Sequence, residues 1–333
     1  MGLITFAAKA QQVAAVPSPS AAKPLRALDL AAWQRTDGAL ILSSHGPDVV
    51  DPYFALKGLW LAHHLGLDVS AAWAPWAAWM VRRQQANGLW GRWRLTPTGV
   101  RPDRASDADD SLLALWLQCV ALFGLPAQLQ VQHAPGLRKA AAHLQGPLFN
   151  ARLGVYRVFA KDDAHLWMDN IEVWSALLTL AQGGLSWCEG LPGAAHWQQS
   201  AQALQASMAR VFVADGVLLP RVSTQRLPEP FAFYPQAVTA PFAWLHGWDP
   251  VARPSARMAA WLVRHEAAWV AQAQSDFPWG LVAAAAQGEG QLAAVHRWLE
   301  RARPLRQGPR WNILEEVAFQ GLSTFNQNQG VDS

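Results

Sequence analysis

The stretch RASDADDSLLALWL, residues 104–117, shows the pattern on which the architecture depends. It starts with a polar cluster and continues as an almost purely apolar run with helical spacing. A helix that is apolar on every side has to be buried. Five other stretches repeat this order of polar or aromatic start and apolar helix: GPDVVDPYFALKGLW from Gly46, HLWMDNIEVWSALL from His165, AFYPQAVTAPFAWL from Ala232, QSDFPWGLVAAAA from Gln274 and RWNILEEVAFQGL from Arg310. The chain therefore carries a weak sixfold repeat.

The helices expected between these stretches, such as 69–85 and 254–270, carry Arg, His and Gln along one side and should be half exposed. Buried helices that alternate with half-exposed ones predict an all-α fold, an (α/α)6 toroid of six helical hairpins in two concentric layers. We expect the twelve helices over residues 28–34, 51–65, 69–85, 109–123, 135–144, 169–181, 194–213, 235–245, 254–270, 277–286, 290–302 and 312–322. Only short pieces, such as residues 217–222, look strand-like.

Composition excludes several classes of protein. Of the 333 residues, 51% are hydrophobic and 15% charged, yet no uncharged apolar run is long enough to span a membrane. A net charge of +3, without a Lys/Arg run, speaks against a nucleic-acid partner. Cys119 and Cys188 lie in apolar helical patterns and form neither a disulfide framework nor a metal cluster. The compartment stays open: cytoplasmic by default, or exported if the N-terminus is truncated or atypical.

The chain divides into one domain with two tails. Residues 1–24 are rich in Ala, Ser and Pro and are expected to form a flexible arm. Residues 25–325 should form the toroid, and residues 326–333 a C-terminal tail. No Gly-rich phosphate loop appears, and the adjacent His63 and His64 lack the spacing of a zinc pair. We therefore expect no cofactor and no bound metal.

The direction of the buried helices gives the main functional inference. All six should run the same way, so their polar N-terminal segments would meet at one end of the ring. Helix capping is the ordinary alternative, since Asp169 with Glu172 and Asn312 with Glu315 have the spacing of a capping box. Residues 107–110, however, supply three acids where a helix start needs one or two. Acids this close repel one another and raise the pKa of at least one, which a general acid near neutral pH requires.

Hydrolysis of a glycosidic bond uses one protonated carboxyl group and one carboxylate. We expect Asp110 and Glu172 to be this pair, with the roles of acid and base open between them, and Asp107, Asp169, Glu315 and Glu316 in support. The sequence has 19 Trp residues, whose flat faces suit the stacking of sugar rings. The residues expected to bind substrate at this end are Trp90, Trp93, Trp167, Tyr234, Asp276, Trp279 and Trp311.

The architecture and several short motifs resemble the six-hairpin glycosidase-like superfamily. The motifs are Asp107-Ala-Asp-Asp110-Ser111, Trp167-Met-Asp169-Asn170-Ile-Glu172, Tyr234-Pro-Gln236-Ala and Asp276-Phe-Pro-Trp279, in a resemblance that covers residues 25–325. It implies a toroid in which acids at the cavity mouth hydrolyse a polysaccharide or oligosaccharide. Some members of the superfamily are lyases, and some have no assigned activity.

Two alternatives remain open. Asp107-Ala-Asp109-Asp110 also resembles the Asp-x-Asp-Asp signature of class II terpene cyclases, and residues 85–90 resemble their Gln-to-Gly-x-Trp repeat. Those enzymes usually need two helical domains, and this chain has length for one. A non-catalytic glycan-binding protein would need the aromatic wall alone.

Overall fold

The computed structural model describes residues 25–46, 48–214, 217–223, 232–248, 256–306 and 308–329. The expected arm (1–24) and the end of the tail lie outside these residues. The α-helices are α1 (Pro52–His64), α2 (Ser70–Val81), α3 (Asp109–Phe123), α4 (Ala127–Gln145), α5 (Trp167–Leu180), α6 (Ala194–Val211), α7 (Thr239–Leu245), α8 (Arg257–Ser275), α9 (Gly280–Gly288), α10 (Leu292–Ala302) and α11 (Ile313–Gln329). A π-helical turn, Phe233–Ala237, precedes α7, and a 3-10 turn, Arg303–Leu305, follows α10.

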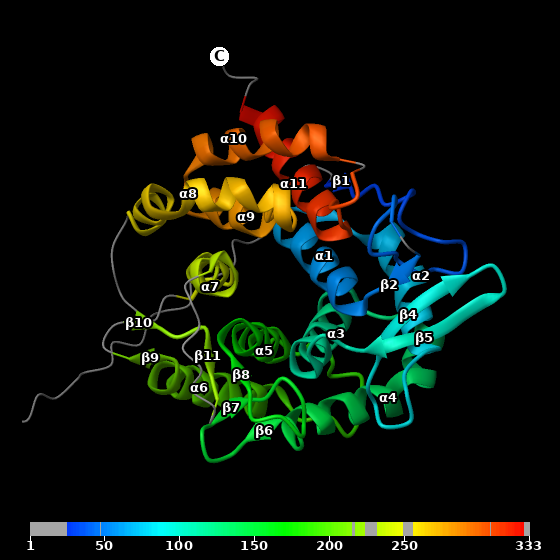
Figure 1. The fold of residues 1–333 in the computed structure, drawn as a ribbon. Coiled ribbons are helices and arrows are strands. Elements are labelled where there is room, and N and C mark those ends of the chain that lie inside the picture. Colours follow the sequence, from blue (N-terminus) through cyan, green and yellow to red (C-terminus); the bar gives the residue numbers. More distant parts are fainter. Residues whose placement is uncertain are drawn as a thin grey trace, which may run out of the picture.

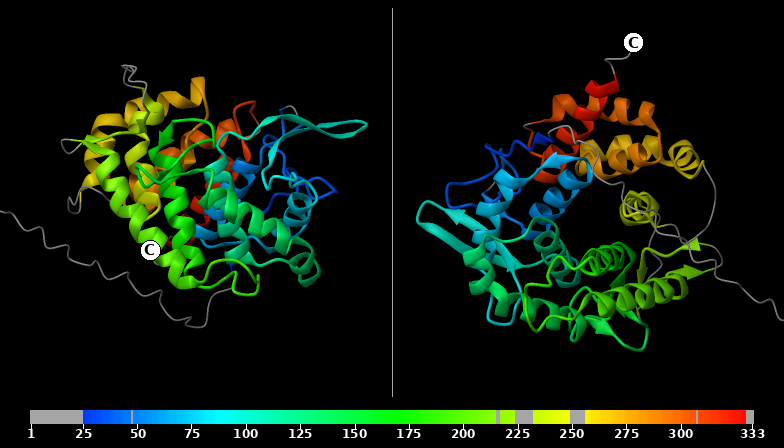
Figure 2. Two further views of the ribbon diagram at one scale, coloured as in Figure 1. Left: turned by 90° about the horizontal axis from the view of Figure 1, so that it is seen from below. Right: turned by 180° about the vertical axis from the view of Figure 1, so that it is seen from behind.

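The odd-numbered helices form a closed inner ring. Each packs on the next in the order α1, α3, α5, α7, α9, α11, and α11 packs back on α1 (Figure 1). Alanine, leucine and tryptophan side chains fill the ring, and α3 is buried along nearly its whole length. The even-numbered helices lie outside the ring, as Figure 2 shows from behind, and α6 and α8 bury one side only. The predicted toroid of two concentric layers is confirmed.

The outer layer has one exception. Residues 28–34 were expected to be a helix, and this prediction is wrong: they form a turn that follows the short strand β1 (Arg26–Ala27). Strand β1 pairs with β3 (Leu67–Asp68), and Asp29 N donates to Gln320 Oε1 of α11. An irregular segment therefore covers the seam between α1 and α11, where a twelfth helix would have stood.

The largest strand feature is one that the sequence pattern did not reveal. Strands β4 (Gly91–Thr96) and β5 (Gly99–Ala105) form a hairpin beside β2 (Val49–Val50), and it projects from the ring just before α3 (Figure 1). The remaining strands are two-residue pairs: β6 (Phe149–Asn150) with β7 (Val155–Tyr156), β8 (His165–Leu166) with β11 (Arg221–Val222), and β9 (Val213–Ala214) with β10 (Val217–Leu218). The strand-like character of residues 217–222 is thus confirmed. No helix in the described part of the chain is long and apolar enough to cross a membrane.

Candidate active site

A cavity of about 420 Å³ opens where the inner helices begin; we call it the acidic cavity. Every inner helix, or the residues just before it, contributes to its wall. The lining side chains include Tyr53, Phe54, Asp107, Asp169, Tyr234, Phe242, Asp276, Phe277, Trp279 and Leu314. The expected convergence of six helix starts on one site is therefore what the structure shows. Five of the residues proposed from the sequence lie here: Asp107, Asp169, Tyr234, Asp276 and Trp279.

Asp169 is the most deeply placed acid of the cavity wall. Helix α5 begins at Trp167, so Asp169 lies in its first turn and is not the cap that the Asp169/Glu172 spacing had suggested. The carboxyl group therefore faces the cavity, and the residue is 8% exposed. Burial raises the pKa of Asp169 well above its ordinary value, and the nearby charges of Glu172 and Asp107 raise it further. Asp169 therefore keeps its proton to a higher pH than an ordinary aspartate does.

Asp110 and Glu172, the pair preferred from sequence, lie beneath the cavity and are fully buried. Burial and the charge of Asp169 raise the pKa of Asp110 well above its ordinary value. Glu172 Oε1 accepts a hydrogen bond from Tyr53 Oη at 3.1 Å and lies 2.7 Å from the Lys57 ammonium. Together these groups form a buried polar floor for the acidic cavity.

Lys57 extends the buried polar contacts from Glu172 toward the opposite end of the ring. Its Nζ lies 2.8 Å from Nε2 of His246, whose ring stacks on Trp60. Burial, together with the charge of Lys57, lowers the pKa of His246 well below its ordinary value. His246 lines a second cavity of about 370 Å³ at the opposite end of the ring, where the inner helices end. The two ends of the toroid are thus connected by buried polar contacts.

Asp107 reaches the cavity from the turn between β5 and α3. Arg92, on β4, lies 2.9 Å from Asp107 and 2.6 Å from Asp51, the N-cap of α1. The side chain of Asp107 is 60% exposed, whereas that of Asp51 is 3% exposed. One arginine of the hairpin thus ties together the starts of two inner helices.

Asp276 and Trp279 form the wall contributed by α9. The Nε1 of Trp279 donates to Asp276 Oδ2 at 3.1 Å, and the indole stacks on Tyr234 and Phe277. Trp279 has a φ of 56°, a left-handed conformation that is strained for a bulky residue. Burial raises the pKa of Asp276. This wall combines the carboxyl group of Asp276 with the exposed aromatic ring of Tyr234.

Glu315 does not line the acidic cavity; its carboxylate binds the backbone at the start of α9. Both of its carboxylate oxygens accept from the backbone N–H of Gly280, at 3.1 and 2.9 Å, directly after Trp279. Burial raises the pKa of Glu315 to about 8. The cap predicted at Asn312 is confirmed, because its side chain accepts from the backbone N–H groups of Leu314 and Glu315.

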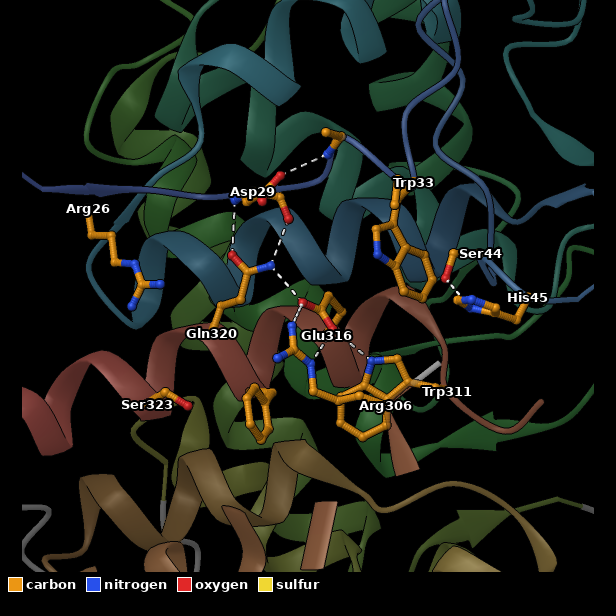
Figure 3. A pocket seen from close by; sticks show the side chains of 13 residues that line it. Arg26, Asp29, Trp33, Ser44, His45, Arg306, Trp311, Glu316, Gln320 and Ser323 are labelled. Carbon is orange, nitrogen blue, oxygen red and sulfur yellow. Dashed lines mark hydrogen bonds and ion pairs between the residues drawn. The ribbon is translucent and has the colours of Figure 1, made fainter. Parts of the chain in front are cut away.

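Glu316 and Trp311 lie at a different depression, shown in Figure 3. Glu316 forms a bidentate pair with Arg306 and accepts from Trp311 Nε1 at 2.8 Å and Gln320 Nε2 at 2.8 Å. Its oxygens are therefore used in holding α11 to the neighbouring segments. We conclude that Glu316 has a structural role, which corrects its place among the candidate acids.

Three predicted sugar-binding tryptophans do not line the acidic cavity. Trp90 is 1% exposed and donates to the Met80 carbonyl oxygen. Trp167 is fully buried and stacks on Trp248, while Trp93 packs edge-on against Trp79. Their indoles pack between secondary-structure elements, so the expectation that they stack on sugar is corrected for all three.

Several residues of the site were missed in the sequence. Tyr53, Phe54 and Lys57 belong to the first repeat, and their apolar or basic character hid them among residues expected in the core. Arg92 lies on a hairpin that showed no strand pattern. The acidic cluster at Asp107 was the one available indication of Arg92, because an acid so close to other acids calls for a basic partner and Arg92 pairs with Asp107.

The geometry gives less support to terpene cyclisation. Asp109 accepts a hydrogen bond from Ser106, and Asp110 is buried below the cavity, so only the first Asp of the Asp-x-Asp-Asp motif lines it. Among the described residues, no group of three or more His, Cys, Asp or Glu side chains could hold a metal ion.

No protein-family model matches the chain, and no curated protein matches it either. The structure is similar to solved structures of a reducing-end-xylose releasing exo-oligoxylanase. The xylose complex has a TM-score of 0.57 and 14% sequence identity over 87% of this chain and 85% of that one. A second structure of the enzyme has a TM-score of 0.57 and 15% identity over 87% of each chain. The chain shares the toroidal fold of that glycosidase, as the six-hairpin resemblance implied.

Proposed function

We propose that the protein is a glycoside hydrolase that cleaves a polysaccharide or oligosaccharide in the acidic cavity. The observation that carries this proposal is Asp169, a carboxyl group in the cavity wall whose pKa burial and neighbouring acids raise well above its ordinary value. A carboxyl group that stays protonated near neutral pH can donate its proton to a leaving glycosidic oxygen. The shared fold with an enzyme named for releasing xylose supports the same class of reaction.

In this mechanism Asp169 gives its proton to the glycosidic oxygen as the bond to the anomeric carbon breaks. Asp276 takes a proton from the water that attacks the same carbon. Asp276 lies just before α9 and Asp169 on α5, and α7 separates these helices in the ring, so the two acids approach a ligand from different walls. Tyr234, which stacks on the buried Trp279 and is 50% exposed, offers an aromatic face beside them.

Asp107 supports the reaction by its charge. It is one of the groups that raise the pKa of Asp169, and its pair with Arg92 fixes its position. The side chain of Asp107 is 60% exposed and therefore in contact with solvent. The strained backbone of Trp279 fits a residue held in place for ligand contact.

The test is an assay of reducing ends released from soluble xylans, glucans and their oligosaccharides. Asp169→Asn and Asp276→Asn should each lower turnover at least about a hundredfold, the scale of a lost general acid or base. Asp109→Asn is the matched control: this acid lies in the same cluster but does not line the cavity, and turnover should be kept. Saccharide binding without cleavage would instead indicate a glycan-binding protein, and a cyclic product from geranylgeranyl diphosphate would indicate a terpene cyclase.

A further inference from the structure

A third cavity, of about 470 Å³, adjoins the acidic cavity and has a different charge. The two share Phe54, Asp276 and Phe277 as lining residues, so they lie side by side. We call this third cavity the arginine cavity, because its wall includes Arg94, Arg104 and Arg310.

The arginines are held by the β4–β5 hairpin and the start of α11. Asp103 accepts from Arg94 Nε at 3.0 Å and lies 3.4 Å from Arg104 Nε, so one carboxylate keeps two guanidinium groups side by side. Arg310, from the segment before α11, is anchored by a bond from Nη1 to the carbonyl oxygen of Ala273. Each guanidinium has five N–H donors, and these contacts engage one nitrogen of each.

The wall also suits a sugar ring. Phe54, Phe277 and Trp311 supply aromatic surface, and the amide of Asn312 lies among them. Its Oδ1 is used in capping α11, which leaves the amide N–H groups to donate. Guanidinium and amide donors facing aromatic surface match a sugar that carries an anionic acceptor.

We infer that the arginine cavity is a subsite for an acidic sugar, so the substrate is a glycan that carries uronic acid residues next to the bond cleaved in the acidic cavity. This inference deepens the proposed function and rests on it for the position of the cleaved bond. The uronate carboxylate accepts from Arg104 and Arg310, and its ring packs on the half-buried Phe277. The neighbouring sugar then lies between Asp276 and Asp169.

The test compares oligogalacturonate and glucuronic acid-branched xylo-oligosaccharides with their carboxyl-reduced forms, which differ from them only in the carboxylate. Binding is measured by tryptophan fluorescence on Asp169→Asn, so that no turnover interferes. At least one acidic form should bind about tenfold more tightly than its reduced form, and salt should weaken this preference. Arg104→Gln and Arg310→Gln should each reduce the preference, whereas Arg101→Gln, on the same hairpin but outside the cavity wall, should keep it.

Equal binding of acidic and reduced forms, or a preference that survives both arginine changes, would overturn the inference, as would the absence of binding by every acidic form. Failure of the proposed function gives a different result. In that case the wild-type protein would leave every oligosaccharide intact, while the arginine-dependent preference for acidic forms would persist.

Discussion

The ammonium group of Lys57 lies 2.7 Å from Glu172 Oε1 in the centre of the ring, and neither side chain is exposed to solvent. The pair joins α1 to α5 directly below the acidic cavity. Burial lowers the pKa of Lys57, and the charge of Glu172 opposes that shift. The pair brings two groups of opposite charge together in a place where an isolated charge would be costly.

Loss of Lys57 should destabilise the fold. Lys57→Met removes the ion-pair partner of the buried Glu172, which costs about 3–5 kcal/mol in the free energy of unfolding. The double variant Lys57→Met with Glu172→Gln should recover part of this loss, because no buried charge remains. Urea unfolding of the two single variants and the double variant measures the coupling. Additive losses would show that the two groups do not stabilise each other.

Glu315 should make stability depend on pH. Its folded pKa of about 8 lies above the unfolded value of 4.5, so the native state holds a proton that the unfolded chain releases. The contribution is fully present below pH 4.5 and is lost as the pH rises through about 8. Glu315→Gln stays neutral and can still accept from Gly280. Its melting temperature should fall less than that of the wild type between these pH values, and parallel curves for the two proteins would refute this assignment.

Asp107 should control the alkaline limb of activity. Its charge raises the pKa of Asp169, so Asp107→Asn should lower that pKa and move the alkaline limb of kcat/KM to lower pH. Asp109→Asn provides the comparison, since its charge acts on Asp110. The profile of the Asp107 variant would contradict the account if its alkaline limb moved to higher pH or stayed in place.

Tyr234 and Trp90 should respond in opposite ways. Tyr234 is 50% exposed and lines the cavity, so Tyr234→Ala should weaken oligosaccharide binding about tenfold with little change in melting temperature. Trp90→Phe should lower the melting temperature, because it removes a buried hydrogen bond to Met80, and leave binding by the folded protein unchanged. Titrations followed by calorimetry, with melting curves beside them, separate the two effects. A binding defect in Trp90→Phe would return that residue to the site.

The toroid could be predicted from the sequence because the apolar character of the inner helices repeats in every copy, as in α3 and α5. The common position of the helix starts then followed from the parallel direction of those helices. Which acids face the cavity could not be predicted, because this depends on where each helix begins: α5 starts two residues before Asp169. The segment at residues 28–34 could not be predicted either. Its place is set by the contacts that it and β1 make with β3 and α11, and not by helical propensity.

Tryptophan illustrates the same limit. A buried indole in the core and an indole at a cavity wall occur in similar sequence contexts, as Trp90 and Trp279 show. Only the packing around them separates the two: Trp279 stacks on Tyr234 at the cavity wall, and Trp90 packs beneath α2 and α3 residues. Lys57, one of the site residues that the sequence did not reveal, lies in a run otherwise made mostly of apolar residues.

The most direct test of the central claim is a crystal structure of Asp169→Asn with a bound oligosaccharide that the wild type cleaves. The account predicts a sugar chain in the acidic cavity, with a glycosidic oxygen within hydrogen-bonding distance of the residue 169 side chain and Asp276 on the other side of the same linkage. A saccharide bound only at the far end of the ring or outside the cavity, away from both acids, would contradict it.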